Sequence, residues 1–159
     1  MDTLSDLQQY RYRGARAMIL MHEKAMREFV ETWRKAKAVN VELPPTEDED
    51  YASLETLLYH VFRAARGYMV WICDKLGLPD PQIMPPPPVE ELDAKADEYL
   101  MHLNSRWRLP LMSVEEETMM RPSFRSRWNA EYCIEGMLEH ALAHPMRHGF
   151  QLEEIMAHE

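Results

Sequence analysis

The chain has 159 residues and a formal net charge of −9, with 18 Lys and Arg against 27 Asp and Glu. This length suits one domain with a continuous core, so we expect a single domain over residues 1–159. The acidic excess argues against a nucleic-acid partner, because proteins that bind nucleic acids gather basic residues on one face. Glycine is scarce, with 5 residues, methionine is abundant, with 13, and β-branched residues are few. This composition indicates a helical fold rather than a large sheet.

The sequence carries no sign of export or of membrane insertion. Its first ten residues, "MDTLSDLQQY", are acidic and polar, unlike the start of a signal peptide. The longest strongly apolar run, "YMVWIC" at residues 68–73, is too short to span a bilayer. Cys73 and Cys133 form no CxxC motif, so we expect two buried apolar residues rather than a redox pair. A cytoplasmic protein without a membrane partner is the expectation.

Two helices are predicted in the first half of the chain. The first runs from about Leu4 to Ala38, where Ser5 and Gln8 have the spacing of a capping box and apolar residues recur at helical intervals. The stretch "NVELPPTEDED" then ends it. The second helix covers roughly residues 51–76, and Gly77 can take the left-handed conformation that closes it.

The second half begins with "LPDPQIMPPPP", residues 78–88, which predicts a stiff extended connector. A third helix follows and is closed by Pro110, and a fourth is predicted from near Asn129 to about Met156. The intervening stretch from Leu109 to Trp128 is the least helical, and its segments "LMSV" and "ETMMR" are candidates for a small hairpin. Four helices with two long links indicate an all-α four-helix bundle.

Three histidines recur every four residues in "HALAHPMRHGFQLEEI", residues 140–155. At this spacing His140, His144 and His148 share one face of a helix, and two neighbouring imidazoles can converge on one metal ion. All three cannot, because the first and the last are separated by about 12 Å along the axis. A catalytic site needs a third protein ligand. The candidates on the other helices are, in order, His60, His22 and His102.

Spacing alone leaves two alternatives open. The histidines are either metal ligands or interior residues that form hydrogen bonds, and the helix either kinks at Pro145 or ends near Ala143. Several other sites are excluded because their motifs are missing. There is no HExxH, no ExxH pair of a di-iron bundle, no GxSxG and no glycine-rich phosphate loop.

Residues 140–155 resemble the last-helix signature of the DinB-like superfamily, and "LETLLYHVF", residues 54–62, is similar to the second-helix motif of that family. The resemblance implies an antiparallel four-helix bundle of up-down-down-up topology and a common tendency to form homodimers. It also implies a divalent metal, Zn or Ni before Fe or Mn, held by His60, His144 and His148. His140 then lies one turn earlier, as a pocket residue, an outer-sphere residue or a base.

The function that this resemblance implies is a metal-dependent S-transferase that joins a low-molecular-weight thiol to a small-molecule substrate, with the metal activating the thiol. Two alternatives remain: a metal-dependent hydrolase, and a non-catalytic, stress-associated bundle that binds a metal or another ligand. The non-catalytic alternative remains because a reaction needs a general base, and His140 is the only obvious one near the motif. Further candidates for the pocket are Arg63, Arg66, Arg147, Tyr68 and Trp71. The alternative roles are exposure to solvent for the arginines and packing in the core for the aromatic residues.

Overall fold

Residues 9–158 are described by a computed structural model, which is mostly helical, at 67% helix, with one small two-stranded sheet. The helical class predicted from composition is thus confirmed. The elements in chain order are α2 (Arg13–Ala38), the 3-10 helix η1 (Glu49–Tyr51), α3 (Leu54–Leu76), α4 (Val89–Trp107), α5 (Glu116–Met120), β1 (Phe124–Arg125), β2 (Glu131–Tyr132) and α6 (Ile134–His158).

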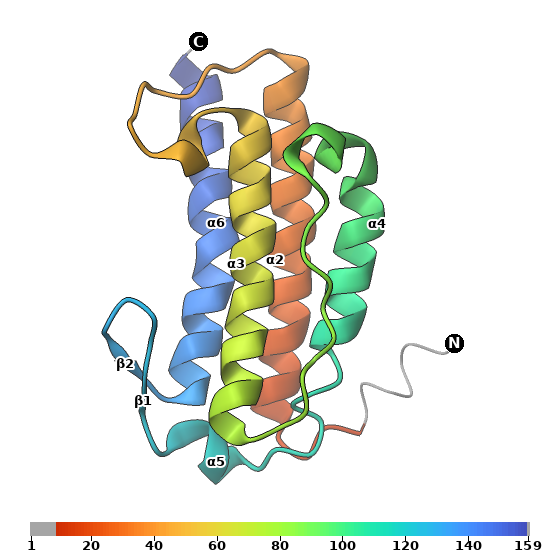
Figure 1. Cartoon of the computed structure of the whole chain (residues 1–159), viewed down its shortest axis with the longest axis vertical. Coiled ribbons are helices and arrows are strands. Elements are labelled where there is room, and N and C mark those ends of the chain that lie inside the picture. The colour runs from red at the N-terminus through yellow and green to blue at the C-terminus, as the bar shows by residue number, and fades with distance from the viewer. Residues whose placement is uncertain (1–8, 159) are drawn as a thin grey trace.

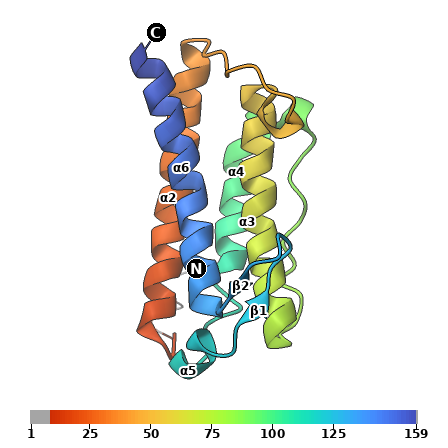
Figure 2. The same ribbon diagram turned by 90° about the vertical axis from the view of Figure 1, so that its left-hand side faces the viewer.

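The four long helices α2, α3, α4 and α6 lie alongside one another (Figures 1 and 2). After α3 the chain returns along the length of the helices before α4 begins, so α3 and α4 run in the same direction, opposite to α2 and α6 (Figure 1). The largest fully buried side chains between them include Trp33, Trp107, Phe29, Phe62 and Met26. Within residues 9–158, no helix combines the length and the apolar character needed to cross a bilayer.

The first described helix starts later than predicted. The proposed capping pair Ser5 and Gln8 lies outside the described residues, and the chain at residues 9–12 is not helical. Tertiary contacts account for this: the Tyr10 side chain is buried and its hydroxyl donates to the Arg108 carbonyl, while the Arg11 N–H donates to the Met112 carbonyl at 3.0 Å. Contacts to a distant segment therefore override the local helical pattern.

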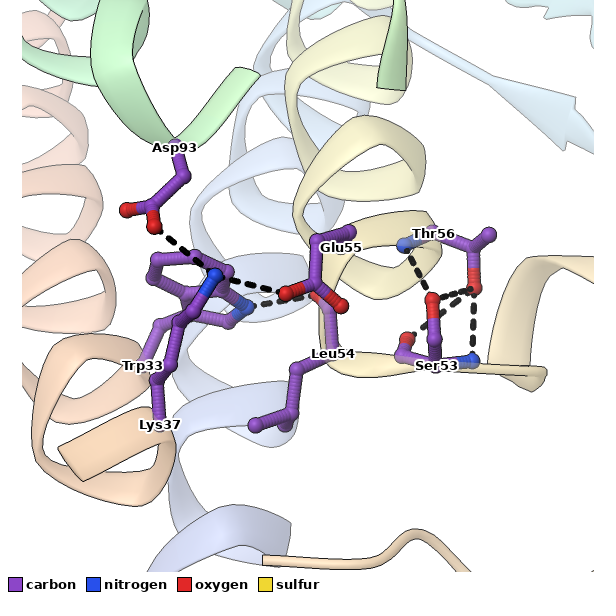
Figure 3. A network of polar contacts seen from close by, with 7 residues as sticks. All are labelled: Trp33, Lys37, Ser53, Leu54, Glu55, Thr56 and Asp93. Carbon is purple, nitrogen blue, oxygen red and sulfur yellow. Dashed lines mark hydrogen bonds and ion pairs between the residues drawn. The ribbon is translucent and has the colours of Figure 1, made fainter. Parts of the chain in front are cut away.

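The N-terminus of α3 is fixed to both neighbouring helices (Figure 3). Ser53 and Thr56 form a capping box, in which each side chain accepts a hydrogen bond from the backbone N–H of the other. The indole N–H of Trp33 on α2 donates to the Leu54 carbonyl at 2.6 Å. Lys37 on α2 contacts Glu55 on α3 and Asp93 on α4, both at 2.7 Å. These contacts fix the position of α3 along the bundle axis, and hence that of His60, six residues after Leu54.

The C-terminus of α3 forms as predicted. Gly77 adopts the left-handed conformation with φ 64°, and the Leu78 N–H closes the helix by donating to the Cys73 carbonyl at 2.9 Å. The extended connector that follows is held by side chains of both flanking helices: Arg66 donates to the Ile83 carbonyl, and Tyr99 to the carbonyl of the next residue along.

The predicted hairpin of "LMSV" with "ETMMR" is wrong. The first segment forms turns, and most of the second lies in α5. Leu111 and Met119 are fully buried, so both segments bury apolar side chains against the bundle instead of pairing with each other. The hairpin forms farther on, between β1 and β2, with Phe124 opposite Tyr132.

The last helix begins at Ile134 rather than near Asn129, because Asn129 has φ 68° and takes part in the turn of the hairpin. It continues through Pro145 to His158, so the alternative of a helix end near Ala143 is wrong. Burial explains the continuity, since Pro145 lies on the buried face of α6 together with Ala141 and Leu152. The packing of this face offsets the one backbone hydrogen bond that proline removes.

Candidate metal centre

Helices α3 and α6 bring His60, His144 and His148 together. One ring nitrogen from each residue lies within 4.8 Å of the other two. The shortest contact, 3.0 Å, joins Nε2 of His60 to Nε2 of His144. The two α6 histidines are buried and the α3 histidine is partly exposed. The structure therefore brings together the three residues that the resemblance selected, while His140 is not part of this group.

The donor set suits a divalent cation. Imidazole nitrogens bind zinc at about 2.0–2.1 Å, so nitrogens that share one ion lie about 3–4 Å apart. The contact of 3.0 Å between His60 and His144 is within this range. The outer limit of 4.8 Å exceeds it slightly, so a displacement of one ring by less than about 1 Å would complete the set.

The two α6 histidines are neutral at physiological pH. Burial, followed by the charges of His148 and His60, lowers the pKa of His144 to about 3. Burial and the charge of His60 lower the pKa of His148 to about 4, although its contact with Gln151 acts in the opposite direction. Only neutral imidazole offers a lone pair to a metal, so the burial that disfavours protonation also keeps both rings in the form that can bind one.

Polar side chains lie next to the Nδ1 atoms of two of the three rings. Nδ1 of His60 lies 3.0 Å from Oδ2 of Asp50, which also receives Arg63 at 2.9 Å. Nδ1 of His148 lies 3.0 Å from Oε1 of Gln151. Partners of this kind hold a ligating imidazole in one orientation and direct its other nitrogen toward the ion. Nδ1 of His60 and Nδ1 of His144 are both buried without a hydrogen-bond partner among the described residues, so the pair of His60 with Asp50 is a close charge contact rather than a hydrogen bond.

Sequence reasoning missed Asp50 and Tyr51, which belong to η1. The aromatic ring of Tyr51 lies 5.5 Å from that of His60 and 5.7 Å from that of His148. The stretch "TEDEDY" reads as a solvated acidic connector, and only its position just before the capping residue Ser53 indicated that it lies near the start of α3.

The remaining candidate histidines lie elsewhere. His22 is fully buried in the core and stacks on Trp107 with ring centroids 3.7 Å apart, and burial lowers its pKa to about 3. His102 accepts a hydrogen bond from the Met84 N–H at 2.9 Å. His140 is outside the triad and stacks on Trp128 at 4.8 Å, and burial followed by the charge of Arg147 lowers its pKa.

Two hollows adjoin the triad. The smaller one, about 220 Å³, is lined by His60 together with Arg63, Tyr68 and Trp71. The last two are also largely buried, so they serve both as core and as pocket wall. The larger one, about 860 Å³, is mostly apolar and includes Tyr51 and Gln151 in its lining. Arg66 does not line either hollow, since it is bound to the connector.

The site thus consists of three imidazoles from two helices, two supporting polar side chains and two adjoining hollows. Comparison of the chain with protein-family models, with curated proteins and with solved structures finds no match.

Proposed function

We propose that this chain is a DinB-like four-helix bundle of up-down-down-up topology that binds a divalent metal ion through His60, His144 and His148. The helix directions visible in Figure 1 support the topology. The observation that carries the metal site is the convergence of the three imidazoles, with nitrogens from α3 and α6 only 3.0 Å apart. Such a donor set suits Zn, Ni, Cu or Fe, and we propose Zn or Ni as the native metal.

We further propose that the centre transfers a low-molecular-weight thiol to an electrophilic small molecule. A bound divalent ion supplies Lewis acidity, which lowers the pKa of a thiol that reaches it. Three neutral ligands leave the charge of the ion uncompensated, which makes this effect as large as possible. Gln151 orients the ring of His148, the Asp50 carboxylate lies beside that of His60, and the hollow beside His60 gives access to the site.

His140 is the proposed acceptor of the thiol proton. It is neutral at physiological pH, since burial and the charge of Arg147 lower its pKa, so a ring nitrogen can accept a proton. Its ring lies 5.5 Å from that of Tyr68, which in turn lies 5.8 Å from that of His144. The proton acceptor and one of the proposed ligands, His144, therefore contact the same aromatic side chain.

One observation favours a non-catalytic alternative, in which the bundle binds a metal or another ligand without a reaction. The carboxylate nearest to the triad, Asp50, is already engaged by Arg63 and His60, so it is not free to act as a base. The same observation weakens the hydrolase alternative, which needs a base for water.

The metal site is tested by elemental analysis of protein without a polyhistidine tag, after incubation with zinc or nickel and gel filtration. We expect about one ion per chain, and less than about 0.1 ion in His144→Ala. His158→Ala is the matched control, because His158 is exposed at the end of α6, and it should retain the ion. Less than about 0.1 ion in the unaltered protein would refute the metal centre.

The reaction is tested with metal-loaded protein, a common biological thiol and chlorodinitrobenzene. A metal-dependent rate that His144→Ala abolishes and that His140→Gln reduces about 100-fold supports the transferase. Stoichiometric metal without any rate above background supports the binding protein instead.

A further inference from the structure

The smaller hollow has a floor of small side chains on α3. His60, Ala64, Gly67 and Trp71 follow one another at intervals of three and four residues, so they lie on one face of the helix. The two central residues carry a methyl group and a hydrogen atom, which leaves a depression between the imidazole at one end and the indole at the other. This floor is about 16 Å long, at 1.5 Å of rise per residue.

The opposite wall comes from the turn of the β1–β2 hairpin, which provides Arg127 and Trp128. Figure 2 shows the hairpin beside α3 and the first turns of α6. The hairpin is anchored to α3, because the Trp71 indole N–H donates to the Arg125 carbonyl at 3.3 Å. Trp128 stacks on His140 of α6 and donates to the Tyr132 hydroxyl at 3.2 Å. The wall is therefore held in place by both long helices.

The two arginines that line the hollow differ in their partners. At the triad end, Arg63 is neutralised by Asp50, which it contacts through both carboxylate oxygens. Farther from the triad, the guanidinium of the exposed Arg127 lies over the middle of the floor, with Nη1 3.7 Å from the position that a Cβ on Gly67 would occupy. Within residues 9–158, Arg127 forms no hydrogen bond or ion pair with another side chain. The hollow therefore presents the uncompensated positive charge of Arg127, although the chain as a whole has a net charge of −9.

We propose that this hollow binds a small aromatic carboxylate. The carboxylate meets Arg127, whose planar guanidinium matches it with two parallel hydrogen bonds. The ring lies among Tyr68, Trp71 and Trp128, and the remaining end points toward His60. The volume of about 220 Å³ is below the usual range of drug-sized pockets, so the ligand is small. The inference rests on the proposed function only in treating this ligand as the electrophilic substrate of the metal centre.

The test is the binding of benzoate to the full chain, measured by calorimetry and by tryptophan fluorescence. Trp128 is 47% exposed whereas Trp33 and Trp107 are fully buried, so the fluorescence change reports mainly on this hollow. Benzamide, which lacks the charge, and acetate, which lacks the ring, are the matched ligands. We expect benzoate to bind at least about tenfold more tightly than either.

Arg127→Gln should weaken benzoate binding about tenfold or more without changing the metal content. Arg13→Gln removes the same charge from an exposed position that does not line the hollow, and it should leave binding unchanged. The titration is repeated on metal-free His144→Ala protein, where binding should persist, so a failure of the metal site does not obscure the result. Equal affinity for acetate, no saturation up to about 50 mM benzoate, or an Arg127→Gln protein that binds normally would each overturn the proposal.

Discussion

Oδ2 of Asp50 lies 3.0 Å from Nδ1 of His60, so the short 3-10 turn before α3 places a carboxylate beside the imidazole that α3 directs at α6. The same carboxylate contacts Arg63, one turn after His60. The connector between α2 and α3 is therefore part of the site as well as a link between helices.

Replacing Asp50 with Asn should weaken zinc binding about 10- to 100-fold, because carboxylates behind a ligating histidine fix its orientation and raise its basicity. A competition titration with a chromophoric chelator measures the change. Glu47→Gln removes the same charge from an exposed residue of the same connector and should have no effect. Equal affinities of Asp50→Asn and unaltered protein would contradict a supporting role for this contact.

The metal-free protein should lose stability in mild acid. Burial lowers the pKa of His22 and His144 to about 3 and that of His148 to about 4, all below the ordinary value of 6.5. Below pH 6.5 the unfolded chain takes up protons that the folded chain does not bind, so this stabilisation is complete above pH 6.5 and is lost as the pH falls toward 3. Urea unfolding at several pH values measures the loss.

His22→Phe isolates one contribution to that pH dependence, since it keeps a flat ring against Trp107 and removes the titrating group. The slope of the unfolding free energy between pH 6 and pH 5 should fall by about 1 kcal/mol per pH unit. An unchanged slope would show that His22 does not contribute.

Two glycine substitutions should change the free energy of unfolding in opposite directions. Gly77→Ala should lower the unfolding free energy by about 1–2 kcal/mol, because φ is 64° and an L-residue is strained there, although nothing lies within 4 Å of the added atom. Gly136→Ala, inside α6, should raise it by about 0.5–1 kcal/mol, since the new methyl group lies 3.5 Å from Cys133 Sγ, an ordinary contact. Denaturant titration of both proteins checks the pair, and a stabilising Gly77→Ala would contradict the helix end described above.

Trp33→Phe should destabilise the protein by about 1–3 kcal/mol, because the buried Leu54 carbonyl loses its indole donor. The amides of the first turn of α3 should then exchange faster with deuterated solvent. Trp128→Phe changes an exposed indole and should alter stability by no more than about 0.5 kcal/mol. Equal losses from the two substitutions would mean that the tether between α2 and α3 contributes nothing specific.

The parts of the site that follow from local periodicity could be predicted from the sequence. Four-residue spacing on a helix determines that His144 and His148 share a face, whatever the rest of the chain does. His60 on α3 could not be predicted in this way. Its position along the bundle axis depends on tertiary contacts such as that of Trp33 with Leu54, which no local sequence pattern encodes. Residue spacing gave His60 only as the first of three candidates, and the resemblance to a family selected it.

The errors arose where tertiary contacts override local signals. Tyr10 carries a helical pattern forward from residue 4 but is buried against the segment around residue 108, so the helix starts later. Leu111 and Met119 belong to the two segments proposed as a hairpin, yet both are fully buried by the bundle instead of pairing. Asp50 belongs to the site because the folded chain places it beside His60. The acidic composition of the connector does not predict this proximity.

The two hollows have a kinetic consequence for any reaction that the centre performs. His60 faces one hollow, while Tyr51 and Gln151, which contact the other side of the triad, face the second. His60 lines only the smaller hollow, and none of the three histidines lines the larger one, which reaches them through Tyr51 and Gln151. On the proposed transferase function, we expect the two reactants to occupy the two hollows, so that neither has to leave before the other binds. A transferase built in this way needs no fixed order of addition, and its double-reciprocal plots for the two substrates would intersect rather than run parallel.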